Sequence, residues 1–408
     1  MIGVLLIVLL IIFGIDYYAF TGLKSLLSGS ELRWRRIATI AYGITSLCTL
    51  AGFALLVIAS QTTSHSLYLW ATGLLSWAMA LMLGKLIWIG FLLGSDLWTL
   101  AERGIAMSQG KSAPVSDSRR KFIAQVGLTV ASLPFASMAY GILKGKYDYQ
   151  LRKLNFTHPD LPEAFDGFTI VQLSDIHSGS FDNQRAVARG VELAMQQQAD
   201  LIVFTGDLIN REAAEFTPWR ETFAALNAPY GMYSTMGNHD YPDHKPESEW
   251  QAHLDEMAAH HEAVGFQLLN NAHVNLEKEG QHISLIGVEN WGEPPFPQLG
   301  DLDKALKGTE ASPFRILLSH DPTHFDHKVV PHPTHIHLTL AGHTHGMQFG
   351  VETEGFRWSP VKYRYPKWAG RYDAEGRTLY VNRGFGFIGF SGRVGIWPEV
   401  TLITLRKA

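Results

Sequence analysis

Two histidines, His343 and His345, lie between glycines in the stretch "AGHTHG", directly after the apolar run "IHLTL". Four other short apolar runs in the second half of the chain also end in polar residues, namely Asp175 and His177, Asp207, Asn238 and His239, and His320. Carboxylate, amide and imidazole donors without cysteine suit borderline divalent ions such as Mn²⁺, Fe²⁺ or Zn²⁺. Because these donors outnumber what one ion needs, the sequence predicts two metal ions that share a bridging ligand.

The apolar runs that precede these residues have the character of short buried strands. We expect one strand at residues 168–173 and another at 201–204, separated by a helix in which Val187, Val191 and Met195 share one face. Such a βαβ unit has a right-handed crossover that brings both strand ends to the same edge of the sheet. Gly342 and Gly346 would permit a close backbone approach beside the two histidines.

The first half of the chain has a different composition, with four long apolar segments at residues 2–21, 37–59, 67–93 and 123–143. A helix needs about 20 apolar residues to cross a hydrocarbon core of about 30 Å, so these lengths favour transmembrane helices over buried soluble ones. Pro134 interrupts the fourth segment, which a cleaved signal-type segment would also explain. We therefore expect a membrane domain at residues 1–145 and a second domain at 146–408.

The basic residues of the short loops predict the orientation of these helices. The first and third loops are basic, whereas the second loop, "SQTTSHS", carries no formal charge. The first and third loops should therefore be cytoplasmic, which places the second domain outside the cytoplasm. Lys144 and Lys146, just after the fourth segment, argue against this orientation. The stretch "SRRKFIAQ" at 118–125 resembles a twin-arginine export signal, but it also reads as an ordinary basic helix flank.

Two charged residues, Asp16 and Lys85, lie inside the apolar segments. A charge at this depth is costly and usually finds a partner, so the two side chains could pair with each other. Alternatively, Lys85 could extend its ammonium group toward the membrane surface.

The motifs "DIH", "GDLIN", "GNHD", "SH" and "GHTH", in this order, resemble the calcineurin-like metallophosphoesterase superfamily. The resemblance spans residues 168–405 and is greatest to membrane-attached or twin-arginine-exported bacterial phosphoesterases. It implies an α/β fold, a four-layer α/β/β/α sandwich of two mixed sheets, which would follow an all-α membrane domain of about four transmembrane helices.

The same resemblance implies a role for each motif residue. Asp175, His177 and His345 would hold the first ion, and Asp207 would bridge it to the second. Asn238, His320 and His343 would complete the coordination of the second ion. A hydroxide between the ions would attack the phosphorus. His239 lies next to a ligand and is not needed for coordination, so it is suited to protonate the leaving group as a general acid.

One position departs from the family pattern. Asn210 stands where many members have an aspartate that hydrogen-bonds the catalytic histidine, and an amide oxygen would stabilise an imidazolium less well. Arg211 follows where the family often places a phosphate contact, for which a planar bidentate donor is suited. A solvated surface arginine is the alternative.

Other polar and aromatic residues receive plainer interpretations. We expect His244, His253, His260 and His261 to be surface or cap residues rather than a third metal site, and His335 and His337 to be packed or to support ligands. Tyr363, Tyr365, Trp368 and Lys362 would line the substrate entrance, rest at a membrane interface or pack in a loop.

These features together predict a membrane-tethered, dinuclear phosphoesterase at a bacterial inner membrane. Its substrate would be a phosphodiester, phosphomonoester or pyrophosphate, with lipid-linked or cell-envelope esters favoured. A non-catalytic metal-binding scaffold and the regulatory domain of a transporter are the alternatives. The net charge of −4 and the mixed charges give no nucleic-acid signal. Cys48 is the sole cysteine, which excludes an intrachain disulfide.

Overall fold

The computed structural model describes residues 2–59, 65–111, 117–242 and 245–408. His244 lies outside the described residues. The chain divides into two compact units, Met1–Leu143 and Lys144–Ala408, here called the amino-terminal and carboxy-terminal units.

The described part of the amino-terminal unit consists of four helices, each long and apolar enough to cross a membrane. They are α1 (Ile2–Leu26), α2 (Leu32–Ala59), α3 (His65–Ser108) and α4 (Asp117–Leu143). Helix α3 continues to Ser108, well beyond residue 93, where we expected it to end, because the residues that follow are more polar but include no proline. Pro134 lies inside α4 and does not end it.

Polar contacts join these helices at two places along their length, around Lys85 and around Arg119 and Arg120. Lys85 of α3 forms an ion pair with Asp16 of α1, so the first of the two alternatives, pairing of the two buried charges, holds. Tyr42 of α2 donates a hydrogen bond to the main-chain carbonyl of Asp16, at 2.7 Å. Arg119 and Arg120 of the "SRRKF" stretch are paired with Glu102 and Asp96 of α3, at 2.8 and 2.9 Å. These arginines thus hold α4 to α3, as a basic helix flank would.

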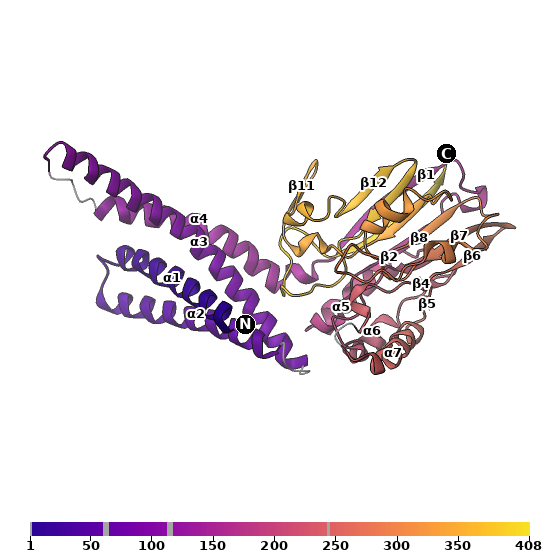
Figure 1. The fold of residues 1–408 in the computed structure, drawn as a ribbon, viewed down its shortest axis with the longest axis horizontal. Helices are drawn as coiled ribbons and strands as arrows, with labels where there is room; N and C mark the ends of the chain where they lie inside the picture. The colour runs from indigo at the N-terminus through magenta and orange to yellow at the C-terminus, as the bar shows by residue number, and fades with distance from the viewer. Residues whose placement is uncertain (1, 60–64, 112–116, 243–244) are drawn as a thin grey trace. The chain divides into compact units, whose positions relative to one another are not determined.

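The carboxy-terminal unit contains two mixed six-stranded sheets (Figure 1). In spatial order, the first sheet consists of β1 (Gln150–His158), β14 (Glu399–Lys407), β2 (Thr169–Leu173), β3 (Leu201–Phe204), β4 (Met232–Ser234) and β5 (Gln267–Leu268). The second consists of β12 (Gly370–Ala374), β13 (Arg377–Val381), β9 (Leu338–Ala341), β8 (Arg315–Leu318), β7 (Gln281–Gly287) and β6 (Ala272–Lys278). A separate hairpin is formed by β10 (Val351–Thr353) and β11 (Phe356–Trp358).

Alternating side chains of the central strands build three apolar layers. Leu201 and Val203 of β3 face the second sheet, where they pack in one cluster with Ile316 of β8. Ile202 and Phe204, on the other face of β3, pack against helices α5 (Gln184–Met195), α6 (Arg220–Phe223) and α7 (Trp250–Ala263). The outer face of the second sheet is covered by α8 (Leu302–Leu306) and the helical turn Phe325–Val329. The four-layer α/β/β/α sandwich is therefore confirmed.

The strand directions determine where the site forms. β2, β3 and β4 run parallel to one another, and so do β7, β8 and β9. β2 and β3 are joined through α5, which is the expected βαβ unit. The loops that follow these parallel strands consequently leave each sheet at a common edge.

Candidate metal centre

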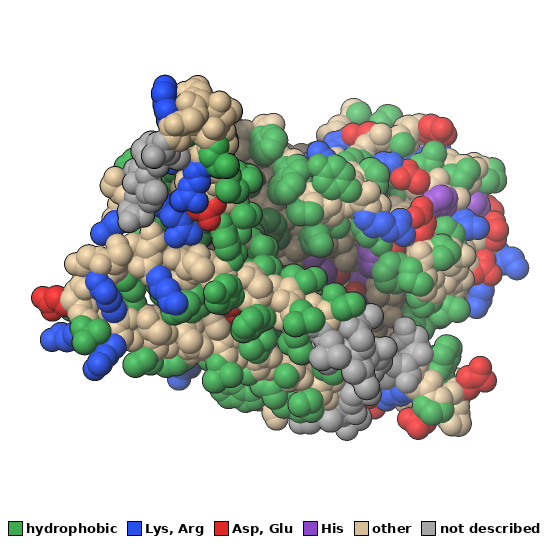
Figure 2. Space-filling model, turned by 60° about the vertical axis from the view of Figure 1, so that its left-hand side comes forward, with side chains coloured by type: hydrophobic (Ala, Val, Ile, Leu, Met, Phe, Trp, Pro, Cys, Tyr) green, Lys and Arg blue, Asp and Glu red, His purple; other side chains and the backbone are tan. Residues whose placement is uncertain are grey.

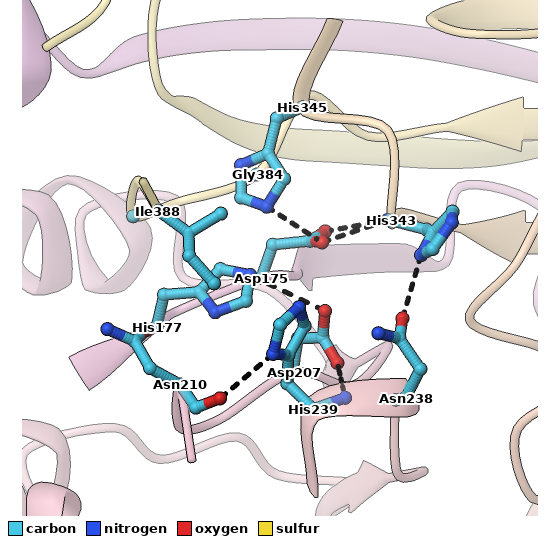
Figure 3. Close-up of polar contacts among 12 residues, drawn as sticks. Asp175, His177, Asp207, Asn210, Asn238, His239, His343, His345, Gly384 and Ile388 are labelled. Carbon is cyan, nitrogen blue, oxygen red and sulfur yellow. Dashed lines mark hydrogen bonds and ion pairs between the residues drawn. The ribbon is translucent and has the colours of Figure 1, made fainter. Parts of the chain in front are cut away.

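Five loops that follow β2, β3, β4, β8 and β9 bring the polar motif residues together (Figure 3). One group consists of Asp175, His177 and His345, and a second of Asp207, His320 and His343. Within each group the candidate ligand atoms all lie within 4.8 Å of one another. The structure thus assembles from distant segments the two sets that the motifs suggested.

Asp207 lies between the two groups. Its Oδ2 atom is 3.4 Å from Nε2 of His177 in the first group and 3.1 Å from Nε2 of His320 in the second. Asn238 joins the second group, since its Oδ1 atom is 2.8 Å from Nδ1 of His343. The seven residues expected to bind metal therefore lie together in one cluster, and the carboxylate of Asp207 faces both groups.

Several donor atoms at this centre have no hydrogen-bond partner in the described structure. Nε2 of His177, His320 and His345 is buried and makes no hydrogen bond of good geometry, although each lies 3.1 to 3.4 Å from a carboxylate oxygen of Asp207 or Asp175. Buried polar atoms are usually satisfied, so three orphaned nitrogens aimed at two carboxylates call for a ligand. Oxygen and nitrogen donors without thiolates fit divalent cations, and the residues present therefore fit a metal centre.

The electrostatics of the centre favour the cation-binding protonation states of His177, His345 and Asp207, but not that of His320. Burial lowers the pKa of His177 and of His345, which keeps both rings neutral at pH 7. Burial opposes ionisation of Asp207, but the charges of His320 and His239 outweigh it and hold the pKa of this carboxyl well below its usual range. Burial would lower the pKa of His320, yet the charge of Asp207 raises it to about 10. A bound cation would therefore displace a proton from His320.

The loops at the centre have an unusual backbone conformation. Five candidate ligands have positive φ angles, namely Asp175 (53°), His177 (47°), Asp207 (62°), His343 (72°) and His345 (51°). Each such non-glycine residue costs about 1 kcal/mol or more and tends to occur where function requires it. Gly342 allows the loop after β9 to approach the loop after β2, because a Cβ atom there would lie 2.2 Å from Oδ2 of Asp175. The expected role of Gly342 in close approach is thus confirmed.

Asp240, the last residue of "GNHD", supports the centre from behind. Its buried carboxylate accepts hydrogen bonds from the main-chain N–H groups of Asp207, Leu208 and Gly237, at 2.7 to 2.8 Å. Burial raises the pKa of this carboxyl to about 7. Our sequence analysis did not assign Asp240 a role, although a carboxylate two residues after Asn238 was a visible signal.

Arg393 lies behind the first group and was also missed. Its guanidinium is fully buried, and Nη2 lies 3.0 Å from Nδ1 of His345. The same guanidinium donates to the carbonyls of Gly384 and Gly386. Phe385 and Gly386 in turn donate from their main-chain N–H groups to the carbonyls of Ser174 and Asp175, at 2.7 and 2.8 Å. The segment before β14 therefore fixes the loop that carries Asp175.

Tyr365 and Asp321 surround the outer side of His343. The hydroxyl of Tyr365 is 2.8 Å from Nε2 of His343, and Oδ2 of Asp321 is 3.4 Å from the same nitrogen. Tyr365 was one of the aromatic residues expected at a substrate entrance or an interface, whereas Asp321 had no assigned role. These two side chains orient the His343 ring with Nδ1 toward Asn238.

His239 reaches the centre beside Asp207, and its ring is held by the main chain. Nδ1 of His239 donates to the main-chain carbonyl of Asn210 at 2.9 Å, as Figure 3 shows. The side-chain amide of Asn210 instead donates to Ser180. Our expectation that the Asn210 amide oxygen orients His239 is therefore corrected, because the loop turns that side chain toward Ser180. Arg211 is exposed on the same loop.

The other histidines lie apart from the two groups. His253, His260 and His261 of α7 are buried, so the surface interpretation was wrong. His261 contacts the hydroxyl of Ser234 in β4 at 2.9 Å, and Nδ1 of His260 accepts a hydrogen bond from Arg220 of α6 at 2.8 Å. Sequence reasoning failed here because α7 has no clear apolar stripe.

His158, His335 and His337 form a third histidine group, which lies at the amino end of β9. Nδ1 of His158 accepts from the main-chain N–H of Asp160, and Nδ1 of His337 accepts from that of Arg315. In these neutral rings Nε2 therefore carries the proton, which makes both rings poor metal ligands. The predicted packing role of His337 is supported by its stacking on Phe314, at 4.5 Å between ring centroids.

Comparison with known proteins gives two family matches on consecutive parts of the chain. Residues 2–146 match the family described as "Probable Calcineurin-like phosphoesterase, transmembrane domain". Residues 168–347 match the family described as "Calcineurin-like phosphoesterase". The second match contains all seven candidate ligands and His239.

Curated relatives cover most of the chain. A "Transmembrane protein with metallophosphoesterase domain" of Danio rerio is 27% identical over 75% of this chain and 68% of its own length. The "Uncharacterized metallophosphoesterase YkuE" of Bacillus subtilis is 28% identical over 71% of this chain and 98% of its own length. The "Phosphodiesterase YaeI" of Escherichia coli is 26% identical over 71% of this chain and 99% of its own length. The chain is thus a membrane-integrated member of the calcineurin-like phosphoesterases, a metal-dependent hydrolase of phosphoric esters.

Proposed function

We propose that a catalytic domain at residues 146–408 hydrolyses a phosphodiester at a centre for two divalent ions, while a membrane domain at residues 1–145 holds it in the membrane. The observation that carries this proposal is the position of Asp207 between two groups of buried donor atoms. Asp175, His177 and His345 would hold one ion, and Asn238, His320 and His343 the other. Mn²⁺, Fe²⁺ and Zn²⁺ suit this donor set.

Two such ions, when bound, supply charge neutralisation for the phosphoryl oxygens and an activated water as nucleophile. The chain itself supplies the proton for the leaving group. Because Nδ1 of His239 is engaged by the carbonyl of Asn210, Nε2 is the atom free to face the substrate. His239 would therefore donate a proton from Nε2 to the departing oxygen. Arg211 lies exposed on the neighbouring loop and would contact the phosphate, for which its guanidinium is suited.

A phosphodiester is favoured because the Escherichia coli relative is named a phosphodiesterase. Membrane integration favours an ester carried by a lipid or by the cell envelope. We propose a bacterial inner membrane with the carboxy-terminal unit on its outer side. Lys24, Arg33 and Arg35 at the α1–α2 junction, together with Lys111 and Lys121 at the α3–α4 junction, support this orientation under the positive-inside rule.

The alternatives are less well supported. A non-catalytic scaffold would not require a histidine beside the ligands, yet His239 lies there with its ring held in place. A transporter would need more intramembrane charge than the Asp16–Lys85 pair provides.

Asp207→Asn tests the proposal in the full-length protein. This change removes the negative charge that both groups share, so we expect elemental analysis to show loss of both ions. Hydrolysis of bis(p-nitrophenyl) phosphate, measured after chelation and return of Mn²⁺, should be nearly abolished. Two ions retained at full activity would overturn the proposal. Arg185→Ala, an exposed change on α5, serves as the matched control.

A further inference from the structure

The exposed apolar side chains of the carboxy-terminal unit gather in one short segment. Among its described residues, five large hydrophobic side chains are strongly exposed, and four of these lie between residues 347 and 363. They are Met347 (58%), Val351 (48%), Phe356 (59%) and Tyr363 (78%). Here they are called the apolar rim. Scattered exposed hydrophobic residues are ordinary, but a concentrated set indicates an interaction surface.

The apolar rim lies beside the metal centre. Met347 is two residues after His345, and Tyr363 is two residues before Tyr365, whose hydroxyl contacts His343. Ser359 and Trp368 fasten the segment to the "GHTHG" loop through hydrogen bonds with Gly346 and Thr344. Figure 2 shows histidine side chains on the same face of the carboxy-terminal unit as hydrophobic and basic side chains. Whatever contacts the rim is therefore brought close to the reacting groups.

The β10–β11 hairpin has the reverse of the usual amphipathic pattern. Its register pairs Val351 with Trp358 and Thr353 with Phe356, and alternation puts these four side chains on one face. That face is the more exposed one. Glu352, on the opposite face, forms ion pairs with Arg383 and Arg152 of the sandwich. The charges are thus turned inward and the apolar side chains outward.

The side-chain types around the rim narrow the choice of partner. Residues 347–367 include four basic residues, Arg357, Lys362, Arg364 and Lys367, and two acidic ones, Glu352 and Glu354. Arg364 and Lys367 form ion pairs with Glu293 and Asp326, whereas Lys362 lies over the exposed Tyr363 ring, at 5.4 Å from its centroid. Aromatic and aliphatic side chains beside lysine and arginine are typical of surfaces that rest in the headgroup region of an anionic bilayer. A bilayer is always close, because the same chain is integrated in the membrane.

We propose that the apolar rim dips into the surface of the bilayer and presents the metal centre to phosphodiesters carried by lipids. The membrane contact stands on the rim alone, whereas the substrate class rests on the proposed function. The phosphate would lie near the headgroup plane, close to the metal centre, while the acyl chains remain in the bilayer. A lipid ester could then be hydrolysed without leaving the membrane.

A single fluorophore in the full-length protein tests the contact. Cys48→Ser removes the native thiol, and Phe356→Cys then allows an environment-sensitive dye to be attached at the rim. In nanodiscs that contain anionic lipid, the emission should shift to the blue and be quenched by spin-labelled phospholipid. A dye at Glu277→Cys, an exposed position of β6, should show neither the blue shift nor the quenching. β6 and β12 are the two edge strands of the second sheet.

Absence of quenching at position 356 would overturn the membrane contact. If the dye were instead self-quenched in a protein dimer, a second copy of the chain would be the partner. Equal quenching at position 277 would also contradict the proposal, since the contact would then not be specific to the rim.

A pair of chromogenic esters with the same leaving group tests the substrate class. Phe356→Ser should raise KM for phosphatidyl-p-nitrophenol in vesicles by roughly tenfold, because it removes most of one apolar side chain from the contact. The rate on soluble bis(p-nitrophenyl) phosphate should not change. An equal effect on both esters would overturn the lipid-presentation role. If wild type hydrolysed neither ester, the proposed function would fail while the dye still decided the membrane contact.

Discussion

At the scale of single residues, a small number of hydrogen bonds orients the donor side chains of the metal centre. The carboxylate of Asp240 accepts hydrogen bonds from three main-chain N–H groups, one of which is that of Asp207. The main-chain carbonyl of Asn210 orients the ring of His239. At this centre, the ring nitrogens left without a hydrogen bond are the ones that would face a cation. A change at His239 and a change at a ligand should therefore have different consequences.

His239→Asn should leave both ions bound, because none of the seven candidate ligands is altered. Only the proton step should suffer, by about 10²–10⁴-fold for leaving groups of high pKa and much less for activated aryl esters. The measurement is metal content together with rates on a leaving-group series. Asn210→Ala is the matched control, since the carbonyl that holds His239 belongs to the main chain. Metal loss in proportion to activity would show that His239 is a ligand.

The convergence of the candidate ligands could be predicted from the sequence because donor residues follow short apolar strands, and strand ends converge in an α/β fold. The supports could not be predicted in this way. Arg393 lies 48 residues beyond His345 along the chain and reaches it only after the tail folds back. Asn210 does lie beside His239, but its main-chain carbonyl makes the contact and its side-chain amide does not. The direction of a loop side chain depends on neighbours such as Ser180, which the sequence does not reveal.

At the scale of elements, helix α7 carries buried neutral histidines that link stability to pH. Burial lowers the pKa of His261 to about 3, compared with about 6.5 in an unfolded chain. The unfolded state therefore binds the extra proton, and the stabilisation that is complete above about pH 6.5 is lost as the pH falls toward 3. The slope from this one group is about 1.4 kcal/mol per pH unit.

His261→Gln should accordingly reduce the acid sensitivity of the fold. Urea unfolding of the full-length protein in detergent, at pH 7, 6 and 5, would measure the free energy of unfolding of wild type and variant. The variant is expected to be less stable at pH 7 but to lose less stability on acidification. Parallel pH dependences would contradict the assignment of this proton to His261.

The helices of the amino-terminal unit are linked by a buried ion pair whose two partners should be energetically coupled. Lys85→Met leaves Asp16 unpaired among apolar side chains, and Asp16→Asn leaves Lys85 unpaired; each should cost about 3–5 kcal/mol. The double variant should be destabilised by clearly less than the sum. Thermal unfolding in detergent, analysed as a double-mutant cycle, measures the coupling. Additive effects would mean that the pair contributes nothing to helix association.

At the scale of the whole molecule, the two units have separate cores, and the sequence showed this through composition alone. Hydropathy located all four helices, but it ended α3 near residue 93, whereas the structure ends it at Ser108. The helix backbone continues because Glu102 and Arg103 are good helix formers although they are not apolar. The apolar segment that could cross a membrane is therefore shorter than the helix α3 that contains it.

The proposed orientation is tested by a reporter fused after Ala408. Alkaline phosphatase, which is active only outside the cytoplasm, should be active there, and a reporter that works only in the cytoplasm should be silent. The reason is that the basic helix junctions should remain on the cytoplasmic side. The reverse pattern would place the carboxy-terminal unit inside the cell.

The position of β14 between β1 and β2 has a consequence for the order in which the protein can be made. The four helices are complete soon after they leave the ribosome, so they can enter the membrane during translation. The first sheet has to wait, because β1 is synthesised early in its unit and pairs in parallel with β14, the last strand. The loop that carries Asp175 is fixed by Phe385 and Gly386, which also emerge late. Nascent chains are therefore anchored well before they can acquire metal.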